Sequence, residues 1–222
     1  NAAKKRPTDR LPGLTYWPED DAIVVRNGTV WDNRPLYCNG RYVFVKAGEM
    51  PSLTGPMGTL YVGIGRGKTR VLLHQFAERV ARYRPGRMEW EMTDQRLPGL
   101  TVRLTGTTPA DASGYTAQLV VEGAQPGDSA AWCVLPPTPE KWTRQANGFK
   151  SDHVLGRFSA QVGTWEQFAA EGRDDLGKAG PNAAGDGLVA WIPLEAGQPQ
   201  CLAVVADEND AYFKRPLNPA TV

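Results

Sequence analysis

The sequence has no apolar run of eighteen residues, so no stretch of it is expected to cross a membrane as a helix. It also has no excess of one charge, because 25 Lys and Arg stand against 24 Asp and Glu, and no block of five like charges occurs. Its only basic cluster, residues 4–6, lies beside Pro7 and is typical of a solvated tail. A surface dedicated to nucleic acid is therefore not expected.

Potential metal ligands are few. Three cysteines, Cys38, Cys133 and Cys201, are widely spaced, and the chain has only two histidines, His74 and His153. This set is too small for a structural zinc site, and the length permits a sizeable core without one, so we predict no metal and no cofactor. Buried free thiols are the leading interpretation and one disulfide is the alternative, so cysteine content does not indicate the redox compartment.

Against these absences stand 24 glycines, 18 prolines, seven tryptophans and seven tyrosines, a composition that favours strands and turns. We predict an all-β fold, mainly an antiparallel β-sandwich or supersandwich, with one or two short helices. Turn-forming clusters at residues 111–114 and 125–128 separate some of its strands. The expected strands are residues 41–46, 59–64, 88–92, 100–105, 115–121, 130–135, 157–162, 188–193 and 201–206.

The domain organisation follows from the same pattern. Residues 1–15 are expected to be a tail or leader strand, residues 16–215 a single β-sandwich domain, and residues 216–222 the start of a linker. The proline-rich residues 136–139 are interpreted as a loop within the sandwich.

Two Asn-Gly pairs, beginning at Asn27 and Asn39, each lie between strand-forming residues. Asn-Gly supplies the positive φ angles that a two-residue turn needs. Each pair therefore predicts a hairpin or another tight strand-to-strand turn.

Helical signals are confined to two segments. Residues 164–171 predict a short helix, because Thr164 can cap its start, Gln167 completes a capping box and Gly172 can end it. Residues 71–83 remain open between helix and strand, since apolar side chains recur there at helical spacing.

A glycine-rich stretch at residues 63–69 is similar to a phosphate-binding loop that ends in Lys68-Thr69. The first glycine of that motif would fall at position 62, where Val62 stands instead. A strand, a glycine turn and a returning strand are therefore predicted, and nucleotide binding is a less favoured alternative.

Two acidic residues, Glu89 and Glu91, would lie on one face of a strand, as the paired carboxylates of a glycosidase could. Alternation with Met88, Trp90 and Met92 also explains the whole segment as a solvent-facing stripe opposite a buried one. The stripe is favoured, and because no nucleophile motif accompanies the histidines, no catalytic residue is assigned.

Flat aromatic rings on a β-sandwich can stack on sugars while nearby polar groups bind the hydroxyls. Three tryptophans in loop-like or helical positions are the candidate carbohydrate-binding residues: Trp17, Trp142 and Trp165. Core packing is expected of the three in apolar, strand-like surroundings: Trp90, Trp132 and Trp191.

Several stretches, taken together, resemble the N-terminal β-rich region of one uncharacterised family of large exported bacterial proteins. That family is common in Bacteroidetes and is regarded as a glycoside hydrolase family. The resemblance covers about residues 16–135, with Pro35 and Glu49 as mild departures. The stretches are DAIVVRNG (21–28), NRPLY (33–37), AGEMP (47–51), GTLYVGI (58–64) and ARYRPGRMEWE (81–91).

The resemblance implies a β-sandwich placed ahead of a larger helical domain that holds the active site, in a protein exported to the periplasm or the cell surface. It makes residues 71–83 a strand that leads into the turn at residues 84–86. Its motifs are structural, so no catalytic residue is carried over. The resulting hypothesis is a non-catalytic module whose partner is the adjacent catalytic domain of the same polypeptide, with glycan as a second expected partner. The alternative is a free-standing carbohydrate-binding protein that uses loop aromatics.

Overall fold

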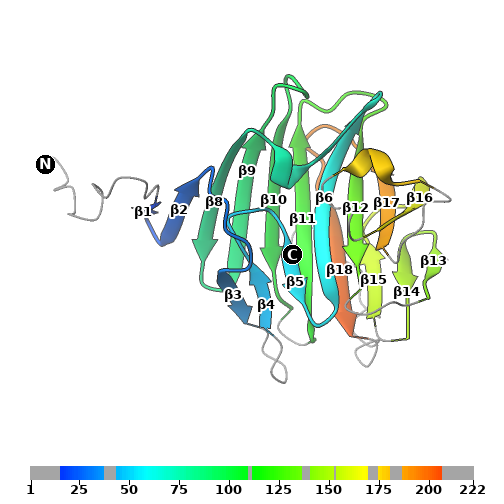
Figure 1. The fold of residues 1–222 in the computed structure, drawn as a ribbon, viewed down its shortest axis with the longest axis horizontal. Coiled ribbons are helices and arrows are strands. Elements are labelled where there is room, and N and C mark those ends of the chain that lie inside the picture. Colours follow the sequence, from blue (N-terminus) through cyan, green and yellow to red (C-terminus); the bar gives the residue numbers. More distant parts are fainter. Residues whose placement is uncertain are drawn as a thin grey trace, which may run out of the picture.

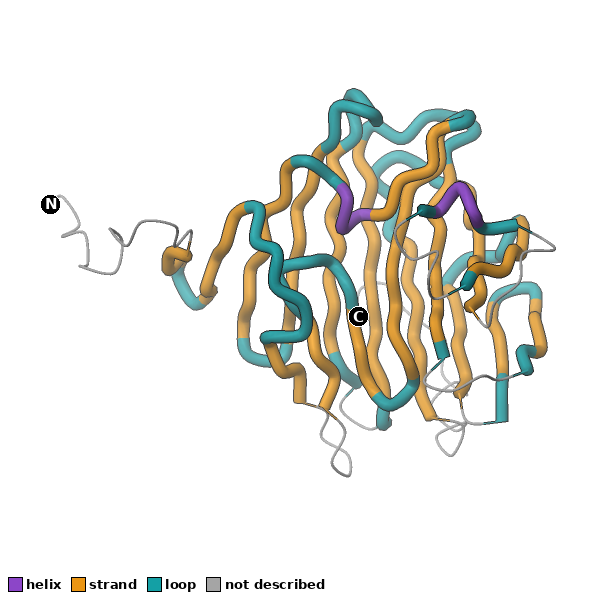
Figure 2. Tube along the Cα trace, in the orientation of Figure 1, coloured by secondary structure: helices purple, strands orange, loops and turns teal. Residues whose placement is uncertain are grey.

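The computed structural model describes residues 16–37, 44–109, 112–136, 141–152, 154–169, 175–180 and 187–206. Within these ranges the protein is all-β, with two antiparallel sheets and no α-helix, as Figures 1 and 2 show. The predicted fold class is confirmed. No helix in the described part of the chain is long and apolar enough to span a membrane.

The first sheet has ten strands, and its middle is a run of consecutive antiparallel strands from β8 to β11. In spatial order the strands are β1 (Tyr16–Glu19), β2 (Ala22–Arg26), β8 (Glu78–Arg84), β9 (Arg87–Thr93), β10 (Thr101–Thr107), β11 (Gly114–Glu122), β18 (Gln200–Ala206), β15 (Val154–Phe158), β14 (Gly148–Lys150) and β13 (Thr143–Gln145).

The second sheet has eight strands, and a short strand, β7, pairs with the same edge of β6 as β5 does. In spatial order its strands are β16 (Thr164–Phe168), β17 (Gly187–Pro193), β12 (Ser129–Leu135), β6 (Gly58–Arg66), β5 (Leu53–Gly55), β4 (Phe44–Ala47) and β3 (Arg34–Tyr37), with β7 (Thr69–Leu72) beside β6.

The main core lies between the two sheets and takes side chains from both. Trp90 on β9 and Trp132 on β12 are fully buried, and each indole N–H is satisfied, by Gly48 O at 3.0 Å and by Gln200 Oε1 at 3.3 Å. Trp191 is also buried, so the expected burial of these three tryptophans is confirmed.

The second sheet is buried on its outer face as well. A separate apolar cluster there includes Leu72 from β7, Phe168 from β16 and Leu176 from a 3-10 turn, η4 (Leu176–Lys178). Gly63 on β6 makes room for this layer, because a Cβ at that position would lie 2.7 Å from Leu176 Cδ2. The strands β6, β12 and β17 therefore read as nearly continuous apolar segments.

The helix predicted for residues 164–171 is wrong, because residues 164–168 form the edge strand β16, paired with β17. Along this strand Glu166 and Phe168 are buried while Trp165 packs against the main core on the other face. Pairing with β17 and burial of both faces outweigh a local capping signal.

Residues 71–83 form no helix. The chain leaves β7 at Leu72, makes a 3-10 turn, η2 (Leu73–Gln75), and continues as β8, which agrees with the strand implied by the resemblance. The predicted strand, glycine turn and strand is confirmed, because β6 and β7 pair Arg66 with Thr69 across the two-residue turn Gly67-Lys68. Gly67 has a φ of +58°, the left-handed conformation that such a turn requires.

The tight turn predicted at Asn27 is wrong. Asn27 has a φ of +51° at the end of β2, and the next strand, β3, belongs to the other sheet. Its side chain instead fixes the end of β2 to β8, since Asn27 Oδ1 accepts a 2.7 Å hydrogen bond from Arg79 N. Asn39-Gly40 lies outside the described residues, although the flanking strands β3 and β4 do pair antiparallel.

The predicted strands are confirmed in seven places: residues 59–64, 88–92, 100–105, 115–121, 130–135, 188–193 and 201–206. Two are confirmed in part, because β15 ends at Phe158 and only residues 44–46 of the segment 41–46 are described. Residues 1–15, 137–139, 207–222 and Cys38 lie outside the described ranges. Cys133 and Cys201 are buried free thiols, and burial raises the pKa of both, that of Cys201 to about 11.

Tyr115 generates a stability prediction, because this fully buried side chain has no hydrogen-bond partner for its hydroxyl within the described structure. An unpaired buried hydroxyl costs free energy, so Tyr115→Phe should leave the free energy of unfolding unchanged or raise it by up to about 1 kcal/mol. Trp90→Phe, which loses volume and the bond to Gly48 O, should instead lower it by roughly 2 kcal/mol. Urea denaturation measures both, and a destabilised Tyr115→Phe would show that the hydroxyl is paired.

Candidate functional site

The strand registers bring four strand ends of the second sheet together. Ser129, which begins β12, lies opposite Gly65 of β6 and opposite Pro193 at the end of β17. Thr164, which begins β16, lies opposite Trp191. These ends meet at one end of the sandwich, where the β6–β7 hairpin and the β11–β12 loop also lie, at the top of Figure 1.

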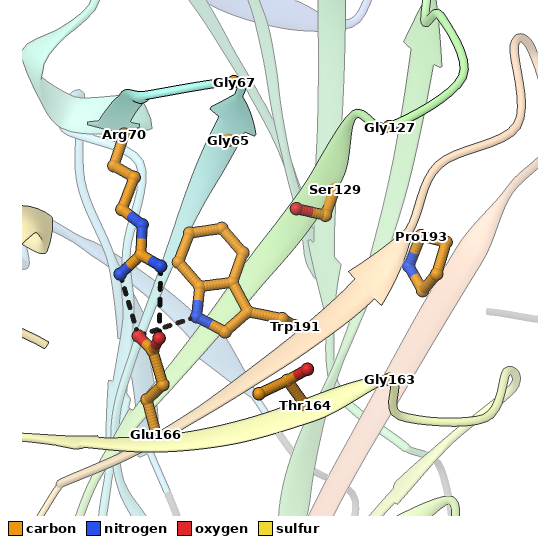
Figure 3. Close-up of a pocket in the computed structure, with 10 residues that line it drawn as sticks. All are labelled: Gly65, Gly67, Arg70, Gly127, Ser129, Gly163, Thr164, Glu166, Trp191 and Pro193. Carbon is orange, nitrogen blue, oxygen red and sulfur yellow. Dashed lines mark hydrogen bonds and ion pairs between the residues drawn. The ribbon is translucent and has the colours of Figure 1, made fainter. Parts of the chain in front are cut away.

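A pocket of about 260 Å³ opens at this end. Four of its lining residues are glycines, which leave the backbone bare, and Gly65 is required by close packing, since a Cβ there would lie 2.8 Å from the Trp191 ring. Figure 3 shows the lining residues: Gly65, Gly67, Arg70, Gly127, Ser129, Gly163, Thr164, Glu166, Trp191 and Pro193.

Arg70, Glu166 and Trp191 form one hydrogen-bonded unit in this pocket (Figure 3). Arg70 donates from Nη1 to Glu166 Oε2 at 3.0 Å and from Nη2 to Glu166 Oε1 at 3.1 Å. Trp191 Nε1 donates to Glu166 Oε2 at 2.9 Å, and the Arg70 guanidinium carbon lies 4.7 Å from the indole centroid. A bidentate ion pair and a cation–π contact thus share three side chains, which we call the Arg70 clamp.

The three residues of the Arg70 clamp come from β7, β16 and β17. The β6–β7 hairpin sets Arg70 opposite Gly65, while β16 pairs with β17 and sets Glu166 two residues beyond Thr164, the partner of Trp191. Glu166 is 7% exposed, so its charge is largely removed from water and depends on these partners.

The rim of the pocket is fixed by a second bidentate pair. Arg66 at the end of β6 donates from Nε to Asp128 Oδ1 at 2.9 Å and from Nη2 to Asp128 Oδ2 at 2.7 Å. Asp128 also accepts from Gln125 N at 2.8 Å, which closes the loop that carries Gly127. The hydrogen bonds from Arg66 hold the pKa of Asp128 below its usual range.

The chemistry of the pocket is polar and formally neutral. A guanidinium has five N–H donors, and the pair with Glu166 uses two of them. The hydroxyls of Ser129 and Thr164 also line the pocket, and each can donate and accept. Such an arrangement suits an uncharged ligand with several hydroxyl groups.

The structure separates the tryptophans that the sequence proposes as sugar contacts. Trp17 lies on the edge strand β1 and is 36% exposed. Trp142 and Trp165 are half-buried against the main core, and both contact Phe149, with ring centroids 5.3 and 6.5 Å away. None of the three is among the described residues that line the pocket.

The carboxylates of Glu89 and Glu91 lie opposite the buried face of β9, as the solvent-facing interpretation predicts. Each is paired with arginine: Glu89 with Arg84, and Glu91 with Arg103 at 3.0 Å. His74 is buried, with its ring centroid 5.3 Å from that of Trp31, and His153 lies outside the described residues.

Sequence reasoning missed the Arg70 clamp. The sequence pattern assigns Arg70 no role, places Glu166 in a helix and places Trp191 in the core. Residues 164–168 carry no strand signal that could have found it, because Trp165 and Phe168 are three residues apart and do not alternate with polar residues.

Comparison with known proteins identifies no relative. No model of a known protein family matches the chain, and no curated protein is similar to it. The described residues contain no group of three or more His, Cys, Asp or Glu side chains that could hold a metal ion. The function is therefore inferred from the geometry of the site.

A second hollow, of about 610 Å³, opens among the ends of β8, β9 and β10. Its buried carboxylate, Asp94, accepts hydrogen bonds from Arg96 Nε and Arg96 N, both at 2.8 Å, and from Ala77 N at 2.9 Å. These bonds, chiefly from the Arg96 side chain, lower the pKa of Asp94 to about 2. The hollow is lined by Ala77, Glu78, Thr93, Asp94, Gln95, Gly99, Leu100 and Thr101.

Removing the charge of Glu166 should loosen the Arg70 clamp. Glu166→Gln should lower the free energy of unfolding by roughly 1–3 kcal/mol, because Arg70 is left without its ionic partner and Trp191 Nε1 with a weaker acceptor. The intrinsic tryptophan fluorescence of the protein should change as well, since Trp191 Nε1 loses its charged acceptor. The matched control is Glu91→Gln, whose exposed pair with Arg103 should be worth less than about 1 kcal/mol. Equal effects of the two variants would contradict the description of a buried, coupled unit.

Asp94 predicts how stability depends on pH. Its pKa is about 2 in the folded protein, below the usual value of about 3.9, so its contribution is complete above about pH 5 and is lost as the pH falls towards 2. Asp94→Asn should therefore lower the free energy of unfolding by about 2 kcal/mol at neutral pH and by much less near pH 2. Urea midpoints measured from neutral to acidic pH provide the test. An Asp94→Asn protein with the pH profile of the wild type would contradict it.

Proposed function

We propose that this chain is a non-catalytic β-sandwich module that binds carbohydrate at the pocket of the Arg70 clamp. In this proposal the module belongs to an exported carbohydrate-active protein and packs against an adjacent catalytic domain of the same polypeptide. The proposal combines the all-β fold with the chemistry of the pocket.

The observation that carries the proposal is the Arg70 clamp beside the hydroxyls of Ser129 and Thr164. Sugar hydroxyls both donate and accept, and this pocket offers both functions while its formal charges cancel. The bidentate pair and the cation–π contact hold the guanidinium in place before any ligand arrives, so little side-chain entropy remains to be lost on binding. A volume of about 260 Å³ suits a small group such as one sugar ring.

The surroundings of the carboxylates support binding rather than hydrolysis. Most glycosidases place two carboxyl groups across the scissile bond, one of which must give or take a proton. Among the described lining residues of the pocket, Glu166 is the one carboxylate, and both of its oxygens accept hydrogen bonds from arginine or tryptophan. These hydrogen bonds give the carboxylate of Glu166 a structural role and leave no oxygen without a protein donor.

Carbohydrate binding by exposed tryptophan is the second candidate, and Trp17 is the observation that favours it. This ring is 36% exposed on a strand that carries Glu19, which pairs with Arg82 on β8 at 3.2 Å. Trp142 and Trp165 offer less open surface because both pack against the core. The nucleotide alternative is less favoured still, since its glycines lie in a hairpin instead of a loop that opens a helix.

A glycan array followed by calorimetric titration tests the proposal. Arg70→Lys keeps the charge but loses the planar guanidinium and its fixed set of N–H donors. It should therefore weaken glycan binding by about tenfold, the effect of losing roughly 1.4 kcal/mol. Trp17→Ala should leave binding unchanged, and thermal unfolding should confirm that both variants are folded. A loss of binding in Trp17→Ala alone would favour the second candidate, and the absence of any glycan ligand would overturn both.

The non-catalytic part of the proposal has its own assay. Incubation of the chain with chromogenic glycosides should release no product above the buffer control. Hydrolysis that disappears in Glu89→Gln, Glu91→Gln or Glu166→Gln would show that the chain is an enzyme.

A further inference from the structure

The second hollow opens at the same end of the sandwich as the pocket of the Arg70 clamp. Thr93 lies opposite Glu78, and Thr101 lies opposite Glu122, the last residue of β11. From Glu122 the chain passes through residues 123–128 directly to Ser129, which lines the pocket. The loop of residues 123–128 thus starts next to Glu122, the partner of Thr101 in the second hollow, and ends next to Ser129 in the pocket.

Arg66 connects the loop of residues 123–128 to the loop of residues 94–100, which lies between β9 and β10. Besides its pair with Asp128, it donates from Nη1 to Pro98 O at 2.9 Å and from Nη2 to Gly123 O at 3.2 Å. Gly123 has a φ of +75°, and a Cβ there would collide with the carbonyl oxygen of Gly99. The loops of residues 94–100 and 123–128 are therefore in close contact, and Arg66 on β6 forms hydrogen bonds to both of them.

Both hollows are lined in part by glycines, which leave the backbone bare. Gly67 and Gly127 line the pocket and Gly99 lines the second hollow, and all three have positive φ angles, of +58°, +95° and +80°. A Cβ at any of these positions would have no atom within 4 Å, so the space above them is open. Stacked sheets lie about 10 Å apart, so a ligand that reaches across this end is longer than one sugar ring.

The second hollow offers the same kind of chemistry as the pocket. Thr93 and Thr101 supply hydroxyls and Gln95 an amide, while the charge of Asp94 is matched by Arg96. Glu78 adds an exposed negative charge, which disfavours acidic ligands. Neutral hydroxyl-rich groups fit both hollows.

We infer that the two hollows are subsites of one extended site for a linear, neutral oligosaccharide. One sugar lies beside the Arg70 clamp. The following units pass over the two loops that Arg66 connects and reach Thr93 and Thr101. This inference rests on the proposed function and adds the length and the charge of the ligand.

Titration with cello-, xylo- and manno-oligosaccharides, from the monosaccharide to the hexasaccharide, tests the inference. Affinity should rise by about tenfold or more with chain length and then level off once both subsites are filled. The double variant Gln95→Ala/Thr101→Ala should lose most of this gain and keep its affinity for the monosaccharide. Arg70→Lys should weaken binding at every length. Thr105→Ala, on the same strand as Thr101 but away from the hollow, is the matched control.

The outcomes separate this inference from the proposed function. Binding that is independent of chain length, or a double variant that behaves as the wild type, would overturn the extended site and leave a single pocket in place. Binding of oligogalacturonates as tight as that of neutral chains would overturn the stated charge of the ligand. Failure of every length to bind the folded wild type would overturn both proposals.

Discussion

Burial of the second sheet on both faces is the constraint on which the rest of this structure depends. Its inner face meets the main core, and the outer face of β6, β12 and β17 needs an apolar cover, which the side chains of Leu72 and Phe168 and Leu176 of η4 help to form. Gly63 and Gly65 keep β6 thin enough for Leu176 and Trp191 to pack closely. Where this outer layer ends, near the ends of the strands, the polar edge of Trp191 is closed by Glu166, and Glu166 in turn by Arg70. The candidate site is thus the polar border of an apolar layer.

The sequence was informative where one physical requirement governed a whole segment. Residues 100–105 alternate between apolar and polar because one face of β10 meets the core and the other meets water. The turn at Gly67 was predictable because few residues other than glycine adopt its φ angle. Local signals failed where residues distant in the sequence determined the structure. Residues 164–168 pair with β17 as a strand in spite of the helix-capping signal at residues 164–171. Asn27 ends its strand with a hydrogen bond from Arg79 N and does not form a hairpin turn.

The candidate site was not predictable for a related reason. Arg70 and Glu166 are 96 residues apart in the chain, and no local pattern connects an arginine after a glycine turn with an acidic residue on an edge strand. In the order of strands in the sheet, β7 and β16 are not neighbours, because β6, β12 and β17 lie between them. The two side chains therefore meet only in the complete tertiary structure. The same order explains why Trp142 and Trp165 lie against the core, since their neighbours on β14 and β15 are the phenylalanines that fill it.

Charge pairing links the stability of this end to what it can bind. Arg66, Arg70 and Arg96 each hold a largely buried carboxylate with bidentate geometry, so the charges that rigidify the loops also cancel one another. A surface of this kind exerts little long-range attraction on a charged ligand, and its discrimination must come from the fixed directions of hydrogen-bond donors and acceptors. Hydroxyl groups present many such donors and acceptors without charge. The ion pairs that make this end rigid are therefore also the reason to expect a neutral, hydroxyl-rich ligand there.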